Sequence, residues 1–361
     1  MDRAGEWDAA VQIAGVGAQT AIGRSAAATA AAVRAGFSDF VRQRRFRDRT
    51  GEPVVAARAR WLPDDLGITE RLLGLAVPAA REALENVAGD RSARRVRIAI
   101  VLGFPSARPG ISGDLGSSVL SGLVDALREE LSRRHLEVVE TQCLPCGHAA
   151  GSMALESGWR RIRAGEIDCC LAGGVDSYLN AETLGWLDGC GQLHSIENKW
   201  GLIPGEGAGF CLLGRADLVR ESGGSLVSAA VARESKLIKT RTVCTGEGLT
   251  AAFKAALGAL PAGAQIDQTL CDLNGEPYRA DELGFAIVRA RKALRDPSAL
   301  LVPASSWGDV GAASGPLFAA LAVEAGRRGV AKGSSVLLST SSELGERAVA
   351  VLHVPEQHRD V

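Results

Sequence analysis

The sequence predicts an α/β protein, because short β-rich runs alternate with helical stretches along the whole chain. Its 361 residues exceed the roughly 250–300 at which single cores stop growing, so we expect two cores or one large layered core. The 43 glycines are well above the ~7% of average proteins and indicate many tight turns or close backbone approaches. Aromatic residues are few, so Ala, Leu and Val must build the core.

The first part of the chain opens with a strand, VQIAGVGA at 11–18, that ends in a glycine turn. An Ala-rich helix over 25–35 follows it. Period-2 and period-3.6 patterns then alternate. They predict helices at 70–87, 116–134 and 148–164, and strands at 97–103, 136–141, 167–175 and 208–215.

The second part repeats this scheme after a break at ESGG, 221–224. Two successive units of similar order indicate an internal duplication, so we predict one half over 1–222 and another over 223–361. The expected strands are 225–232, 267–274, 335–340 and 348–354, and the expected helices are 247–257, 280–294 and 309–328.

Composition disfavours several classes of protein. Forty-one basic and 42 acidic residues give a net charge of −1, which does not favour binding to nucleic acid. The 8 Phe, 6 Trp and 2 Tyr are too few for a platform on which bases stack, so we expect no nucleic-acid partner. Apolar stretches such as 315–323 are far short of the ~20 residues of a membrane span. Acidic residues near the start disfavour an export signal, and eight scattered cysteines in apolar runs fit a reducing compartment, so we predict a cytoplasmic protein.

Two glycine-rich motifs point to a family. AGEIDCCLAGGVDSY (164–178), followed by GLIPGEGAGFCLLGRADL (201–218), resembles the central region of β-ketoacyl synthases, the condensing enzymes of the thiolase superfamily. VQIAGVGAQTAIG (11–23) is similar to the family's first strand and turn, and SWGDVGAASG (306–315) is similar to a loop and helix start late in its second half. The resemblance covers roughly residues 11–352.

The resemblance implies a thiolase fold, in which duplicated βαβ halves form five α/β layers with an active site where the halves meet. Ketosynthases use a nucleophilic Cys at a helix N-terminus, where the helix dipole lowers the thiol pKa. Two imidazoles then promote decarboxylation of the extender unit and stabilise the enolate.

This sequence departs from that triad at every position. Aligned without a gap from Gly165 and Glu166, the nucleophile falls on His148. The first catalytic His falls on Asn274 and the second on Asp309. The usual Lys is also absent, since PASSW (303–307) offers serines instead, and the Gly-rich loop with a gating Phe reads TSSELGE (340–346).

The trio His148, Asn274 and Asp309 has two interpretations. A His oriented by a carboxylate could act as a general base, with the amide as donor to an oxyanion. Alternatively, Asp309 caps a helix, Asn274 with Gly275 forms a turn, and His148 is a hydrogen-bonded core residue.

Other motifs carry weaker signals. Cys143 and Cys146 form a CxxC, which is typical of a redox couple or half a metal site, but no second pair has metal-ligand spacing and the c-type haem signature is not met. Cys146 as a displaced nucleophile would need a two-residue slip, so packing is the default. GVGAQTAIG does not match a nucleotide-binding loop. We predict no cofactor and no metal site.

Two basic clusters, VRQRRFRDRT (41–50) and RESKLIKTRT (233–242), could dock an acidic acyl carrier protein. A solvated basic loop is the simpler interpretation of each.

The leading hypothesis is a ketosynthase-like protein that has lost condensing activity and acts by binding an acyl carrier, an acyl ligand or a ketosynthase partner. The resemblance admits this, since the family includes chain-length-factor subunits that lack the nucleophile. The alternative is an acyltransferase, decarboxylase or thioesterase that uses the non-standard His148, Asn274 and Asp309 site. By resemblance, the strand at 136–141 pairs with its copy across a two-fold axis, which predicts a homodimer unless the partner is a different ketosynthase chain.

Overall fold

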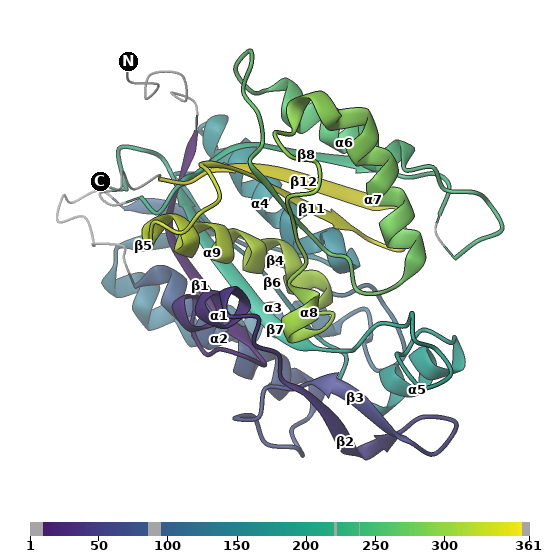
Figure 1. The fold of residues 1–361 in the computed structure, drawn as a ribbon. Coiled ribbons are helices and arrows are strands. Elements are labelled where there is room, and N and C mark those ends of the chain that lie inside the picture. The colour runs from purple at the N-terminus through teal and green to yellow at the C-terminus, as the bar shows by residue number, and fades with distance from the viewer. Residues whose placement is uncertain (1–9, 86–94, 220–221, 238, 356–361) are drawn as a thin grey trace.

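The computed structural model describes residues 10–85, 95–219, 222–237 and 239–355. It is a mixed α/β structure in which the predicted strands and helices alternate (Figure 1). The strands are β1 Val11–Thr20, β2 Phe40–Arg47, β3 Pro53–Ala57, β4 Val96–Gly103, β5 Leu136–Leu144, β6 Cys169–Ser177, β7 Glu206–Gly214, β8 Ser225–Arg233, β9 Gln268–Cys271, β10 Leu300–Leu301, β11 Ser335–Ser341 and β12 Glu346–His353. The α-helices are α1 Ala26–Arg34, α2 Ile68–Leu84, α3 Leu115–Arg133, α4 Ala150–Arg163, α5 Ala181–Gly189, α6 Glu247–Gly258, α7 Pro277–Ala290, α8 Ala304–Trp307 and α9 Ser314–Arg327.

Ten strands form two sets of five with the same internal order. The first set runs β5-β4-β6-β7-β1 and the second β10-β9-β11-β12-β8. In each set the third strand along the chain lies at one edge and the first at the other, which is the arrangement that an internal duplication produces. The sets join through a short antiparallel contact of β1 with β8, at Val11–Leu226 and Gln12–Ser225. The boundary predicted at 222/223 lies between the two sets and stays a prediction.

Helices complete the five layers that the resemblance implies. Helices α2 and α3 pack on the outer face of the first set of strands, and α6 and α7 pack on the outer face of the second. Helices α4 and α9 lie between the two sets and contact strands of both. The largest hydrophobic core surrounds these two central helices, so their N-terminal ends lie where the halves meet.

Glycine lets the outer helix α2 approach β1 closely. A Cβ on Gly17 would lie 1.9 Å from the Ala79 carbonyl oxygen, and one on Gly15 would lie 2.1 Å from that of Ala83. The glycines predicted to end the first strand therefore sit inside it, and the strand continues to Thr20. They serve helix packing in this fold.

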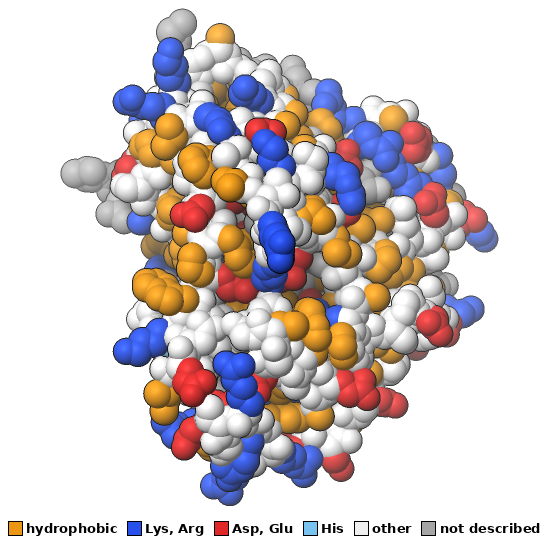
Figure 2. Space-filling model, turned by 90° about the vertical axis from the view of Figure 1, so that its right-hand side faces the viewer, with side chains coloured by type: hydrophobic (Ala, Val, Ile, Leu, Met, Phe, Trp, Pro, Cys, Tyr) orange, Lys and Arg blue, Asp and Glu red, His pale blue; other side chains and the backbone are white. Residues whose placement is uncertain are grey.

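Several elements differ from the sequence-based expectation. The first basic cluster was expected to be a loop, but Arg42 to Arg47 belong to strand β2. This strand pairs with β3 as an antiparallel hairpin. Its arginines are exposed as expected, while Phe46 packs beside Val54 on an apolar cluster that α5 also joins. Basic side chains are spread over the face in Figure 2, and some of them lie at its lower end, where this hairpin lies in Figure 1. Helices α5 and α8 lie in segments predicted as irregular.

Both central helices begin later than predicted, after a short 3₁₀ turn. The turn at Gly147–Ala149 precedes α4, and the turn at Gly311–Ala313 precedes α9. The predicted end of the helix at 70–87 lies outside the described residues. Among the residues that the structure describes, no helix has the length and apolar character to cross a bilayer.

Glu206 of the PGEGAG motif holds three other segments together and is fully buried. Its carboxylate accepts hydrogen bonds from the Arg71 guanidinium at 3.0 and 3.2 Å, the Ala59 backbone N–H at 2.9 Å and the Ser177 hydroxyl at 2.8 Å. Because Arg71 is buried too, this pair satisfies both charges inside the protein.

We therefore expect Glu206→Ala to lower the free energy of unfolding by about 3–5 kcal/mol, because it leaves the Arg71 charge buried without its partner. Denaturant unfolding measures this change. The control is Glu129→Ala, which removes an exposed helix pair with Arg133 and should change stability by less than about 1 kcal/mol. Equal effects of the two substitutions would contradict the anchoring role of Glu206.

Candidate functional site

His148 lies in the 3₁₀ turn that leads into the buried helix α4, as the alignment predicts. It is 6% exposed. Gly147 begins the turn at a φ of 72°, a left-handed conformation that favours glycine. Ala149, the residue after His148, donates its backbone N–H to the Ser342 hydroxyl at 2.8 Å, which ties this turn to the end of β11.

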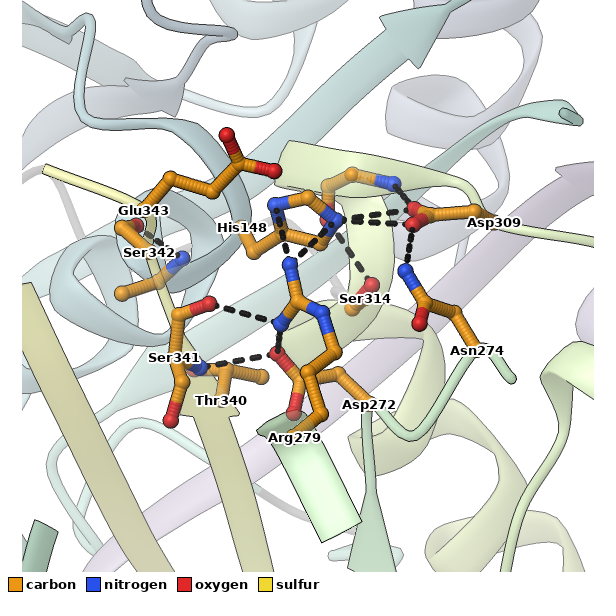
Figure 3. A network of polar contacts seen from close by, with 12 residues as sticks. His148, Asp272, Asn274, Arg279, Asp309, Ser314, Thr340, Ser341, Ser342 and Glu343 are labelled. Carbon is orange, nitrogen blue, oxygen red and sulfur yellow. Dashed lines mark hydrogen bonds and ion pairs between the residues drawn. The ribbon is translucent and has the colours of Figure 1, made fainter. Parts of the chain in front are cut away.

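Asp309 and Asn274 meet His148 although they are distant in sequence (Figure 3). Both Asp309 carboxylate oxygens lie 2.9 Å from His148 Nε2. Asn274 Nδ2 donates to Asp309 Oδ2 at 2.6 Å. The structure thus brings all three predicted site residues together near the N-terminal ends of α4 and α9.

The turn that carries Asp309 is fixed by a hydrogen bond of its own and by contacts with β6. Asp309 Oδ1 accepts the Gly311 backbone N–H at 2.8 Å, and the Asp176 carboxylate accepts the Ala312 backbone N–H at 3.1 Å. A Cβ on Gly174 would lie 2.2 Å from the Ala312 carbonyl oxygen. The AGGVD motif therefore provides a close backbone contact that positions Asp309.

Arg279, on α7, is a site residue that sequence reasoning missed. It is buried, and its Nη1 donates to Asp272 at 3.0 Å and to the Ser341 carbonyl oxygen at 2.8 Å. Its Nη2 lies 3.3 Å from His148 Nδ1 and 3.2 Å from Nε2. No spacing motif marks this residue, since an arginine near the start of an amphipathic helix usually faces solvent.

The contacts of the His148 ring occupy both of its nitrogens. A carboxylate accepts hydrogen bonds and a guanidinium donates them. A ring with its proton on Nε2 satisfies both neighbours, because it donates to Asp309 and accepts from Arg279 at Nδ1. The Tyr178 hydroxyl, 3.4 Å from Nε2, covers the same edge.

The charge of Asp309 is stabilised inside the protein. Burial on its own would raise the pKa of this carboxyl group. The interactions with His148, Arg279 and Asn274 outweigh burial and hold the pKa of Asp309 well below its ordinary value. Asp309 is therefore ionised across the physiological pH range.

A second group of charged residues lies beside His148, Asp309 and Arg279 and has Glu276 at its centre. Its carboxylate accepts hydrogen bonds from Asn274 at 3.1 Å and from the Tyr278 hydroxyl at 2.6 Å. Lys239 Nζ lies 3.4 Å from Glu276 Oε1 and is also paired with Glu343. Burial acts to raise the pKa of Glu276, but the charges of Arg279 and Lys239 and these hydrogen bonds lower it.

Contrary to expectation, the second basic cluster is not solvated throughout, because Lys239 turns toward the site. Its side chain is 27% exposed and is directed to the acidic groups beside the site. Lys236 of the same cluster pairs with Glu247 at 2.9 Å, and Arg241 is exposed. The cluster thus divides between the site and the surface.

A small cavity of 120 Å³ opens beside His148. Leu187, Leu202 and Trp186 form apolar walls, and the buried pair of Arg108 with Asp176, at 2.6 Å, closes another side. Ligand pockets usually measure ~300–1,000 Å³. The cavity can hold a group of a few atoms.

The CxxC cysteines do not have the environment of an activated nucleophile. Burial raises the pKa of Cys143 to about 11 and also raises the pKa of Cys146. A reactive thiol needs a lowered pKa, because the thiolate is the attacking species. These environments favour the packing interpretation.

Comparisons with known proteins agree with this architecture. Residues 138–218 match the model of the β-ketoacyl synthase N-terminal domain, a segment that holds His148 and the PGEGAG loop. No curated protein matches the sequence.

Several solved structures share the fold over nearly the whole chain. The ishigamide ketosynthase/chain length factor matches with a TM-score of 0.75 at 20% identity, over 96% of this chain and 99% of that chain. A β-ketoacyl synthase from Burkholderia phymatum STM815 matches with a TM-score of 0.71 at 18% identity and the same coverage. The AntDE:AntF structure, a type II PKS acyl-carrier protein in complex with its ketosynthase bound to the hexaketide, matches with a TM-score of 0.76 at 15% identity over 96% of this chain and 99% of that chain. The chain has the thiolase fold of these ketosynthases, and its residues 138–218 are similar to the β-ketoacyl synthase N-terminal domain.

Proposed function

We propose that this chain is a ketosynthase-like protein of the cytoplasm without condensing activity, which acts by binding an acyl carrier, an acyl ligand or a ketosynthase partner. The observation that carries the proposal is the His148 ring, held between Asp309 and Arg279 at the position where the alignment expects a nucleophilic thiol. All eight cysteines are free thiols, which supports the reducing compartment.

The chemistry of condensation argues against activity at this site. An enolate intermediate needs hydrogen-bond donors where its negative charge develops. Asp309 is ionised and accepts hydrogen bonds, so its charge would repel an enolate at the position of the second imidazole. Asn274 has already given its Nδ2 donor to Asp309 and Glu276.

The alternative is a general base formed by His148 and Asp309 for acyl transfer, decarboxylation or thioester hydrolysis. A general base needs one ring nitrogen free to take a proton from the reacting group. Arg279 Nη2 lies 3.3 Å from His148 Nδ1, the ring nitrogen that Asp309 does not contact, so neither nitrogen is free and the geometry favours binding over this chemistry.

Two structural neighbours support the choice of partners. One carries chain length factor in its description, and the other is a ketosynthase in complex with an acyl-carrier protein. We propose an acyl carrier protein or a ketosynthase chain as the partner of this protein.

Homodimer formation is part of the proposal, and the edge strand β5 supports it. β5 lies at one end of the strand order and has a neighbour, β4, on one side. Val139 on this strand is 47% exposed, and Glu137, Glu140 and Thr141 are exposed as well. A long edge with an exposed apolar residue is suited to pairing with a second chain.

The first prediction tests for a reaction. Incubation with acyl-coenzyme A or acyl-carrier donors should leave the intact mass unchanged and release no free acid. His148→Cys should show no condensation either, because one thiolate lacks the donors that stabilise the enolate. Calorimetric titration with an acyl carrier protein should still detect binding.

Matched variants separate the two functions. Free acid released by the unmodified protein, lost in His148→Gln and kept in His194→Gln, would establish the alternative enzyme. Condensation by the unmodified protein, or no binding of any acyl-carrier, acyl or ketosynthase partner, would refute the binding proposal.

The second prediction concerns pH. The pKa of Asp309 is lower in the folded than in the unfolded protein, so its stabilising contribution is present above the unfolded value of ~3.9 and is lost as the pH falls below it. Asp309→Asn should lower the free energy of unfolding by about 3 kcal/mol at pH 7, and the difference should shrink below pH 4. Urea unfolding at pH 7, 5 and 3 measures it.

Asp125→Asn serves as the control, since Asp125 is 60% exposed in a surface pair and should change stability by less than about 1 kcal/mol at each pH. A loss for Asp309→Asn that persists unchanged at pH 3 would show that the Asp309 charge does not supply the stability.

The third prediction concerns assembly. Light scattering over a dilution series should report a dimer, and Val139→Lys should shift it to monomer because a buried charge without a partner opposes the pairing of β5 with its copy. Val288→Lys is the control, since Val288 is an exposed residue on α7, 69% exposed. A monomer of the unmodified protein at micromolar concentration, unchanged by a ketosynthase chain, would contradict the proposed assembly.

A further inference from the structure

Three side chains with metal-binding atoms converge outside the candidate site. Glu234 directly follows β8, Cys244 precedes α6 and Glu282 lies on α7. One donor atom from each lies within 4.8 Å of the other two. Both carboxylate residues are 1% exposed, and Cys244 is half-buried.

The hydrogen bonds of this cluster leave one buried oxygen without a partner. Glu234 accepts the backbone N–H groups of Lys236 at 3.0 Å and Gly248 at 2.7 Å. Glu282 Oε1 accepts from Arg347 Nε at 2.7 Å and lies 3.7 Å from Cys244 Sγ. Glu282 Oε2 is buried on the same carboxylate and has no hydrogen-bond partner among the described residues. Such an oxygen is costly unless another group binds it.

The charges of the cluster are also unbalanced. Two buried carboxylates face one buried guanidinium, that of Arg347. Lys236 Nζ pairs with exposed Glu247, and Arg289 donates to the Thr245 carbonyl oxygen, so neither side chain bonds the cluster. Inside the protein the two carboxylates therefore share one cation. The charge of Lys236 also acts on Glu234 and Cys244, but this side chain is partly exposed to solvent, which weakens its effect.

We propose that Glu234, Cys244 and Glu282 bind a zinc-like divalent cation. The thiolate with two carboxylates is a donor set that suits Zn²⁺, whereas Mg²⁺ and Ca²⁺ prefer oxygen alone. Binding replaces the Cys244 thiol proton, which leaves to solvent, by a metal–sulfur bond. The two carboxylates, the thiolate, the Arg347 cation and the metal then sum to zero charge.

The distances permit this after a local adjustment. At tetrahedral angles, Zn–S bonds of ~2.3 Å and Zn–O bonds of ~2.0–2.2 Å place donor atoms about 3.4–3.7 Å apart. Cys244 Sγ and Glu282 Oε1 already lie 3.7 Å apart, and donor atoms separated by up to 4.8 Å must approach by about 1 Å. Cys244 lies in an irregular segment, which can move that far. Three protein ligands leave the fourth tetrahedral position to water.

The site would fix the segment between β8 and α6 at its two ends. Glu234 and Cys244 flank Lys239, whose amino group pairs with Glu276 and Glu343 beside the candidate site. A bound metal would hold that lysine in place. The inference does not depend on the proposed function, because it concerns metal affinity alone.

Cobalt(II) titration of the metal-stripped, full-length protein tests the proposal. We expect one equivalent to bind with a thiolate-to-cobalt charge-transfer band, and zinc to remove the band by competition. Cys244→Ser should abolish the band, and Glu282→Gln should weaken binding by about tenfold or more, since even indirect partners of metal ligands contribute that much. The controls Cys190→Ser and Cys143→Ser/Cys146→Ser should keep the band.

A second measurement uses the unmodified protein, so it does not depend on the folding of a variant. Zinc should slow alkylation of Cys244 by iodoacetamide, followed by peptide mass spectrometry, while alkylation of exposed Cys190 continues at its original rate. Absence of the cobalt band, a band that survives in folded Cys244→Ser, or equal alkylation of Cys244 with and without zinc would overturn the proposal.

Discussion

The contact of His148 with Asp309 connects the turns that precede the two central helices, α4 and α9. Each partner is buried, so the polar pair can persist only because further groups complete it. Arg279 covers the ring and is held in turn by Asp272. The conformation of the loops around the site depends on this closed set of charges, because removing one member leaves another charge unpaired.

The glycine motifs behind the resemblance have a structural explanation that is independent of catalysis. Gly174 admits the Ala312 carbonyl oxygen, and Gly17 admits that of Ala79. Glu206 fixes the PGEGAG loop to the buried Arg71. These glycines and Glu206 are needed for the packing of helices on the sheets. The motifs can therefore be retained when the side chains at the site differ from those of ketosynthases. This separation is why a ketosynthase-like framework is compatible with the binding function that we propose.

The sequence predicted the layered fold and the meeting of His148, Asn274 and Asp309, because the glycine motifs fix the alignment over long stretches. It did not predict Arg279, since burial of that guanidinium depends on Asp272 and on the carbonyl oxygen of Ser341, which tertiary structure supplies. The β2–β3 hairpin was missed because β2 is rich in arginine and has no alternation of apolar and polar residues, so it lacks the usual strand pattern. Charge patterning alone also placed Lys239 at the surface, although acidic groups beside the site draw it inward.

The two edges of the ten-stranded order are unequal. β5 offers nine residues at one end, whereas β10 offers two residues at the other. Head-to-tail addition of chains would have to match the long edge with the short one, and the short edge supplies too few backbone groups to propagate the sheet. Pairing of β5 with its own copy is isologous and uses the long edge completely. The brevity of β10 therefore disfavours open-ended growth through the sheet edges, and the pairing of β5 that we propose would be a closed one.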